Sequence, residues 1–167
     1  VAYLRFLRTN LRFLAFGVVM TTVSGFGQTF FLGLFNPAFQ RAFELSHSGF
    51  GAIYALATLL SATLFMQLGR VLDRLDLRGV TVGVGLGLAG ACLWMALTPA
   101  SAVFLFAGLF LLRLTGQGLS VHVAKTGMAR YFEADRGKAI SISAIGVHLA
   151  ELVFPAAAVA LMASLPV

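Results

Sequence analysis

Residues 69–78, with the sequence GRVLDRLDLR, form a short and densely charged segment between two long apolar stretches. This segment holds five of the eighteen charged side chains of the protein, whereas residues 48–68 and residues 79–112 hold none. A soluble domain has no physical reason for such a contrast. A membrane protein does, because charged side chains are confined to the water-facing turn between two spanning helices. The pattern therefore predicts two membrane-spanning helices joined by a polar turn.

The composition of the whole chain supports the same conclusion. Of its 167 residues, 59% are hydrophobic and 11% are charged, and the mean hydropathy is +0.93. Such values are typical of polytopic membrane proteins and not of soluble domains. The single cysteine, Cys92, gives no disulfide framework and no paired-cysteine metal site, and we expect it to pack as a small buried hydrophobe.

The lengths of the apolar stretches predict an all-α polytopic membrane protein with five transmembrane helices. A helix needs about 20 mainly apolar residues to cross the hydrocarbon core of a bilayer. The uncharged stretch 79–112 is too long for one ordinary span, and Pro99 within residues 98–101 is expected to divide it. The predicted helices form a single transmembrane bundle over residues 1–167 and cover residues 11–35, 48–68, 79–97, 102–124 and 138–162.

The basic side chains predict the orientation of the bundle. Ten of the twelve lysines and arginines fall in the N-terminal flank, the 69–78 turn and the loop after residue 124, which share one side of the predicted topology. Basic residues are enriched on the cytoplasmic side of membrane proteins, so we expect a cytoplasmic N-terminus in a bacterial inner (plasma) membrane. This topology explains the net charge of +6, and no nucleic-acid partner is needed.

Two ionisable side chains are predicted to lie near the middle of the lipid bilayer. Arg113 is about eleven residues into the fourth predicted helix, and Glu151 is about thirteen residues into the fifth. Each would cost roughly 2.5–3.5 kcal/mol if it faced lipid, so both are expected to face the interior of the bundle and to pair with each other. One reading is a structural ion pair. The other is functional, with Arg113 attracting an anionic solute and Glu151 carrying protons.

Further polar side chains share a helical face with these two residues. Gln117 lies one turn after Arg113, and His148 lies one turn before Glu151. Imidazole and a desolvated carboxyl group both suit proton coupling. Polar stripes on several helices predict a shared aqueous cavity on the path of a solute and an ion. The residues assigned to that path are Arg113, Glu151, His148, Gln28, Gln117 and Ser24.

Each of the uncharged assignments has a structural alternative. For Gln28 and Gln117, a hydrogen bond between helices is as good an interpretation as contact with the solute. For Ser24, packing within the bundle is the more common role. His122, nine residues after Arg113, falls on the opposite face of its helix and is not expected to line the cavity.

The charged turn also has residues suited to a conformational latch. Gly69 allows a tight helix end and a close approach of the backbone. Asp73 can face the N-terminus of a helix, where the exposed amides and the dipole favour an anion. Arg74 and Arg78 can bridge to acidic groups on neighbouring helix ends, and closure of these ion pairs would favour one conformation of a rocking protein. The alternative is a solvated loop whose arginines only set the orientation.

The spacing of the glycine, the aspartate and two of the arginines in residues 69–78 resembles the cytoplasmic helix 2–3 motif of the major facilitator superfamily, usually Gly-x-x-x-Asp-Arg-x-Gly-Arg-Arg. Asp76 and Leu77 depart from that pattern. The resemblance implies the first five helices of an N-terminal six-helix bundle in a transporter that works by alternating access and needs a C-terminal half as partner. It also implies that an arginine of the turn pairs with an acid near the end of the fourth helix, for which Glu133 and Asp135 are the candidates.

The loop before the fifth predicted helix resembles a second signature, that of the monocarboxylate porter branch of the superfamily. Residues 131–139 follow the pattern Tyr-Phe-x-x-x-Arg-x-x-Ala, and residues 25–27 match the Gly-aromatic-Gly element of the branch. Val23 stands where the branch has an acidic residue, and Gln28 replaces its tryptophan. This resemblance implies a small organic anion as the solute, in agreement with Arg113.

The sequence contains no motif typical of an enzyme, a metal centre or a nucleotide site, so neither a catalytic residue nor a cofactor is expected. The predicted function is secondary active transport of a small solute, with an organic anion as the candidate solute and protons as the candidate coupling ion. The alternative, from a different functional class, is a five-helix membrane scaffold or partner protein that transports nothing.

Overall fold

A computed structural model of the chain describes residues 2–97 and 99–164, and nearly all of them are helical. Five helices, some of them built from several segments, are long and apolar enough to cross a membrane, as the sequence predicts. Within the described residues there is no strand, which confirms the all-α class. These five helices are called spans 1 to 5 below. They cover Tyr3–Leu34, His47–Leu72, Leu77–Leu97, Ala102–Tyr131 and Arg136–Ser164.

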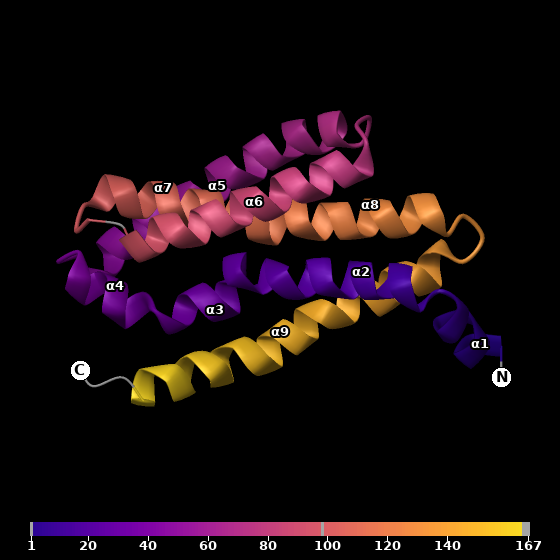
Figure 1. Cartoon of the computed structure of the whole chain (residues 1–167). Helices are drawn as coiled ribbons and strands as arrows, with labels where there is room; N and C mark the ends of the chain where they lie inside the picture. The colour runs from indigo at the N-terminus through magenta and orange to yellow at the C-terminus, as the bar shows by residue number, and fades with distance from the viewer. Residues whose placement is uncertain (1, 98, 165–167) are drawn as a thin grey trace.

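Spans 1 and 4 are series of helical segments, whereas spans 2, 3 and 5 are single helices (Figure 1). Two short helices are not predicted from the sequence: α1 at the start of the chain, and α4 directly after span 1. In chain order the elements are α1 (Ala2–Thr9), α2 (Leu11–Val23), η1 (Ser24–Gly27), α3 (Thr29–Leu34), α4 (Asn36–Ala42), α5 (His47–Leu72), α6 (Leu77–Leu97), α7 (Ala102–Leu112), η2 (Arg113–Ser120), α8 (Val121–Tyr131) and α9 (Arg136–Ser164).

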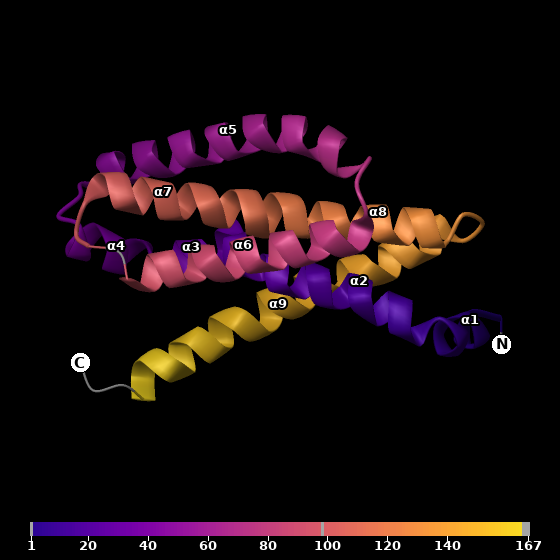
Figure 2. The same cartoon turned by 45° about the horizontal axis from the view of Figure 1, so that its top comes forward.

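The connections between the spans gather at two opposite ends of the bundle. Figures 1 and 2 show the start of the chain, the α5–α6 turn and the α8–α9 loop at one end, and the α4–α5 and α6–α7 connections at the other. The three basic regions of the sequence therefore lie together at one end of the bundle, which is called the basic end below. The break around Pro99 is present, because α6 ends at Leu97 and α7 begins at Ala102, while Thr98 lies outside the described residues.

The helices on either side of the charged turn begin at side-chain caps. Ser46 accepts a hydrogen bond from the amide of Gly49 at 3.0 Å at the start of α5. Asp76 accepts one from the amide of Gly79 at 2.9 Å at the start of α6. Such caps satisfy amides that have no partner within their own helix. The cap at Asp76 fixes where α6 begins and so sets the length of the turn.

Span 1 is interrupted where the sequence predicts one continuous helix over residues 11–35. The α-helix gives way to a 3-10 turn, η1, and Gln28 is then extended, with φ −82° and ψ 152°, before α3 begins. Gly25 and Gly27 explain the interruption, because glycine weakens a helix and leaves room for a close neighbour. The interruption brings the backbone of span 1 against span 4.

Span 4 continues to Tyr131, whereas the sequence predicts an end at residue 124. That prediction is wrong because it assigns the charged side chains of Lys125 and Arg130 to a loop. Gly127 and Met128 are buried in the structure and pack against α2. Tertiary packing therefore holds the last turns of this helix despite their polar outer face.

Close helix contacts hold span 1 at the centre of the bundle. The helices α2 and α9 cross at small residues: a Cβ atom on Gly17 would lie 2.8 Å from that of Ser143, and one on Gly146 would lie 2.2 Å from the carbonyl oxygen of Val18. Three apolar clusters, spread from one end of the bundle to the other, complete the core. This packing positions the interruption of span 1 beside the middle of span 4.

Candidate solute site and basic-end turn

Arg113 begins η2 in the middle of span 4 and lies inside the bundle with 7% of its surface exposed. Its Nη1 donates hydrogen bonds to the carbonyl oxygen of Gly27 at 3.3 Å and to the hydroxyl of Thr29 at 3.0 Å, both in span 1. Among the described residues, no carboxylate forms an ion pair with it. The sequence therefore predicts correctly that Arg113 lies inside the bundle, but it does not predict which residues Arg113 contacts.

Tyr54 of α5 completes the support of this guanidinium. Its hydroxyl donates a hydrogen bond to Oγ1 of Thr29 at 3.1 Å, and Cζ of Arg113 lies 5.3 Å from the centre of its ring, within cation–π range. The network joins spans 1, 2 and 4 around one positive charge. The sequence analysis misses Thr29 because this residue follows the interruption of span 1, where helical periodicity no longer indicates a direction.

A cavity of about 320 Å³ lies beside Arg113. In the part of the chain that the structure describes, Nε of Arg113 and Oγ1 of Thr58 are buried and make no hydrogen bond. A buried polar atom without a partner costs about 1–3 kcal/mol, so both atoms favour the entry of a polar group. Gln117 shares the cavity, as its helical spacing predicts. The lining residues are Thr58, Ser61, Ala62, Phe65, Arg113, Gln117 and Gly118.

The irregular segments of spans 1 and 4 face each other at this site. A Cβ atom on Gly27 would lie 2.1 Å from the carbonyl oxygen of Leu112, and one on Gly116 would lie 2.8 Å from Cα of Gly27. The 3-10 turn η1 and the π-helical segment η2 therefore cross with their backbones in contact. Departures of this kind from α-helical geometry are frequent at functional sites. The contact is close enough for Arg113 to reach the carbonyl of Gly27.

The two polar residues predicted on span 1 have different surroundings. Ser24 is fully buried, and its hydroxyl donates to the carbonyl oxygen of Thr21 at 2.6 Å, within span 1. Gln28 is half-buried at the interruption before α3. Neither is among the residues that line the cavity beside Arg113. Their place on a solute path stays a prediction.

Glu151 and His148 lie on the outer surface of α9 and not beside Arg113. Their side chains are 57% and 79% exposed, and Nδ1 of His148 lies 3.7 Å from Oε2 of Glu151. The predicted pairing of Arg113 with Glu151 is therefore wrong. The face of α9 that packs inward includes Ala150, which contacts Gly25, and the next residue is turned away by the helix. Depth in the bilayer does not decide which face of a helix meets its neighbours.

The turn between α5 and α6 is bound to the end of span 4. Oδ1 of Asp73 lies 2.9 Å from Nε2 of His122 and accepts a hydrogen bond from the hydroxyl of Thr126 at 3.2 Å. Arg130 donates to the backbone carbonyl oxygen of Leu75 at 3.1 Å and to that of Asp73. Side chains of α8 thus hold both the carboxylate and the backbone of the turn.

The position of His122 corrects the sequence analysis, which sets this residue aside because it lies opposite Arg113. The face opposite Arg113 is the one to which the turn binds. A Cβ atom on Gly69 would lie 3.6 Å from the imidazole ring, which is an ordinary van der Waals contact, so the close approach predicted for this glycine is not required here. The sequence predicts that Asp73 faces the N-terminus of a helix. In the structure its carboxylate instead contacts the side chain of His122 in span 4.

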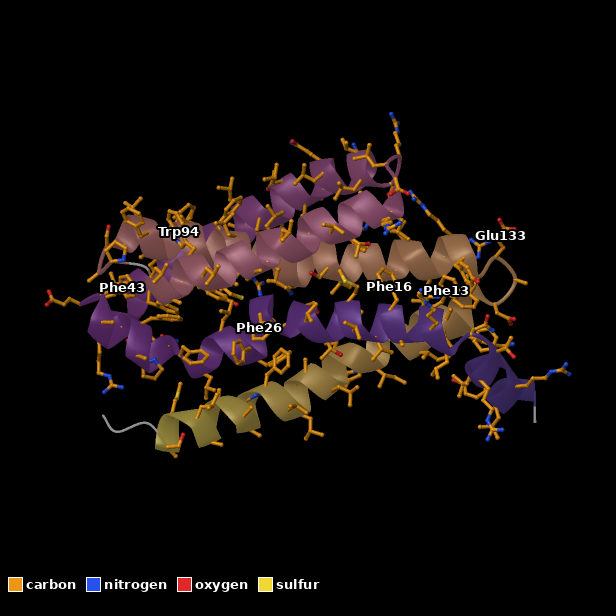
Figure 3. The ribbon with its side chains drawn as sticks, viewed as in Figure 1. Phe13, Phe16, Phe26, Phe43, Trp94 and Glu133 are labelled. Atoms are coloured by element: carbon orange, nitrogen blue, oxygen red, sulfur yellow. The ribbon has the colours of Figure 1, made fainter. Side chains whose placement is uncertain are left out.

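The ion pairs expected at this turn do not form among residues 2–97 and 99–164. Arg74 and Arg78 are exposed and pair with no carboxylate. Of the two acids expected to be their partners, Asp135 pairs with a lysine one turn later at 2.6 Å. The other, Glu133, lies exposed on the α8–α9 loop (Figure 3). The arginine that binds the turn is Arg130 of span 4, and not an arginine of the turn itself.

A family model described as Major Facilitator Superfamily matches residues 17–166. The chain belongs to the major facilitator superfamily. No curated protein and no solved structure matches it. The resemblance read from the charged turn is therefore confirmed at the level of the family.

Membership makes this major facilitator chain an integral membrane protein of a family that transports small solutes and is generally not enzymatic. The match does not favour the alternative of a non-transporting scaffold. It also does not support the finer assignment to the monocarboxylate porter branch.

Proposed function

We propose that this chain forms the first five helices of the N-terminal half of a secondary active transporter that moves a small organic anion by alternating access, with Arg113 as the residue that binds it. One observation carries the proposal. Arg113 is 7% exposed, has no carboxylate partner among the described residues and borders a cavity of about 320 Å³. A charge at this depth costs roughly 2.5–3.5 kcal/mol when nothing compensates it. An anionic solute would supply that compensation.

The geometry of the guanidinium supports a carboxylate as the bound group. Hydrogen bonds to Gly27 and Thr29 hold Nη1, while the buried Nε has no partner among the residues that the structure describes. Guanidinium nitrogens form a planar fork that matches two carboxylate oxygens. The free hydroxyl of Thr58 and the ring of Phe65 would then contact the remainder of the solute.

The remaining polar residues of the path are assigned as follows. Glu151 and His148 would carry protons, since carboxyl and imidazole groups are common proton carriers in membrane transporters. Their exposure on α9 is consistent with a surface that the C-terminal half would cover. Gln117 would contact the solute from the cavity wall, and Gln28 and Ser24 would line the path on span 1.

The α5–α6 turn would act as the latch, through Gly69, Asp73, Arg74 and Arg78. The contact between Asp73 and His122 supports this role, because it ties the turn to the helix that carries the solute site. Arg74 and Arg78 form no ion pair among the described residues and are thus available for acids that approach in another conformation. The excess of basic residues supports a cytoplasmic basic end, in a bacterial inner membrane.

Uptake into proteoliposomes tests the proposal, with the full-length transporter and a panel of small mono- and dicarboxylates. Arg113→Gln should lower uptake at least tenfold, because hydrogen bonds to a charged group contribute about 1.5–3 kcal/mol. Arg113→Lys, which keeps the charge, controls for simple loss of a buried cation. Arg41→Gln, at an exposed position on α4, should transport normally.

Two results would count against this function. Near-normal uptake by Arg113→Gln would make the guanidinium a purely structural group. Uptake of none of the organic acids by the unmodified transporter would reject the organic anion as the solute class.

A further inference from the structure

A second cavity lies at the basic end of the bundle, away from the solute site. It has a volume of about 530 Å³ and opens between the start of α2 and the start of α6. Sites for small ligands have volumes of about 300–1,000 Å³. Arg12 and Arg78 flank this cavity, called the basic groove below, and its apolar walls are Phe13, Phe16, Leu77 and Val82.

The walls of the basic groove are held by packing against α8. A Cβ atom on Gly127 would lie 3.1 Å from the ring of Phe16 and 3.2 Å from Leu77, so α8 closes the back of the groove. The ring of Phe13 stacks on that of Tyr131, with centroids 3.6 Å apart. Figure 3 shows Phe13 and Phe16 together between α2 and α8. The groove is therefore formed before any ligand enters.

The two arginines of the groove are available to a ligand in this conformation. Arg12 and Arg78 are exposed and form no ion pair with any described residue. Asp76, the carboxylate on the groove wall, is engaged as the cap of α6 by the amide of Gly79 at 2.9 Å. The hydroxyl of Thr81 donates to a backbone carbonyl of its own helix at 2.7 Å. The groove thus presents two guanidiniums without ion-pair partners and one capped carboxylate, a net positive charge, above an apolar floor.

The depth of the groove matches the boundary between lipid headgroups and acyl chains. The 21 residues of α6 extend about 32 Å at about 1.5 Å per residue, close to the thickness of a hydrocarbon core of about 30 Å. Arg78 is the second residue of α6, and Arg12 is the second residue of α2. If the start of α6 marks the edge of the hydrocarbon core, we expect both guanidiniums near the level of lipid phosphates, with Phe16 and Val82 one helical turn deeper, toward the acyl chains.

We propose that the basic groove binds an anionic phospholipid. Its phosphate would lie between Arg12 and Arg78, and the first methylenes of an acyl chain would pack on the two phenylalanines of α2 and on Val82. Basic pockets between transmembrane helices are suited to anionic headgroups. A free phosphate would use the arginines and leave the apolar walls empty, whereas a neutral lipid would use the walls alone. The groove combines two arginines with apolar walls, so it favours a ligand that has both a negative charge and an acyl chain.

Native mass spectrometry of the purified protein in detergent tests this proposal by titration with dioleoyl phosphatidylglycerol and dioleoyl phosphatidylcholine. The phosphatidylglycerol should bind more tightly. The double variant Arg12→Gln/Arg78→Gln should bind it at least about tenfold more weakly, because each basic side chain near the surface contributes to the attraction. The matched control is Arg5→Gln/Arg8→Gln, which removes two exposed arginines of α1 outside the groove and should bind as the unmodified protein does.

Three outcomes would overturn the proposal. Equal affinity for the two lipids would show that the headgroup charge is not recognised. An equal loss in both double variants would mean that the general positive charge of the basic end attracts the lipid. Displacement of the lipid by excess inorganic phosphate would show a simple anion site. Thermal unfolding of each variant, followed by the fluorescence of Trp94, verifies that a loss of binding does not come from loss of the fold.

Discussion

Replacing Gly27 with alanine perturbs the crossing of η1 and η2 at its closest point. The added Cβ would lie 2.1 Å from the carbonyl oxygen of Leu112 and 2.8 Å from the amide nitrogen of Gln117, whereas ordinary contact begins at 3.4 Å. Both atoms belong to the backbone, so no side chain can rotate away. Gly27 does not have a positive φ, and the whole cost therefore comes from the contact.

The expected destabilisation follows from this geometry. Overpacking a close-packed site costs about 1–3 kcal/mol, and a clash with two backbone atoms belongs to the upper part of that range, about 2–3 kcal/mol. For a chain of this size such a loss lowers Tm by about 4–12 °C. Because spans 1 and 4 must separate, the hydrogen bonds from Arg113 to Gly27 and Thr29, now 3.3 Å and 3.0 Å, should weaken as well.

Thermal unfolding in detergent and binding of a small carboxylate are the two measurements. Gly83→Ala is the matched control, because Gly83 is exposed on α6 with no atom within 4 Å of its added Cβ. That change should stabilise the helix by about 0.5–1 kcal/mol. If Gly27→Ala melts at the same temperature as Gly83→Ala and binds the solute normally, the backbone contact between spans 1 and 4 does not exist as described.

Three further changes test the other parts of the site. Thr29→Val removes the hydroxyl that accepts from Arg113, and should raise the KM for the anion roughly tenfold in uptake assays; an unchanged KM would show that Thr29 does not orient the guanidinium. Asp73→Asn removes the charge opposite His122, and should change the accessibility of single cysteines placed at the two ends of the bundle; identical labelling at both ends would remove the latch. Glu151→Gln should prevent accumulation driven by a pH gradient while exchange continues, and continued accumulation would exclude Glu151 as the proton carrier.

The sequence predicts the local features of this fold well and the long-range contacts poorly. The second predicted helix, 48–68, lies within α5, because a long apolar stretch forms a helix wherever it meets a membrane. The end of span 4 was misplaced because the packing of Gly127 against α2 is not visible in the composition of its own segment. The interruption of span 1 was missed although its signal, the glycine pair at residues 25–27, was present.

The same division applies to the candidate site. Helical spacing places Gln117 beside Arg113 correctly, because both lie on one helix. It gives no information on Thr29, whose direction is set by the extended residue before it, or on His122, whose partner is on another helix.

By itself, the sequence determined that the described residues, 2–97 and 99–164, form five helices long and apolar enough to cross a membrane, with the basic regions at one end, because apolar length and the placement of charge act within each segment. Only the tertiary structure decided that Arg113 bonds to span 1 while Glu151 faces outward, and that Asp73 meets His122. These contacts depend on which faces of distant helices pack together, and that choice is made by the close approach of small residues across the bundle.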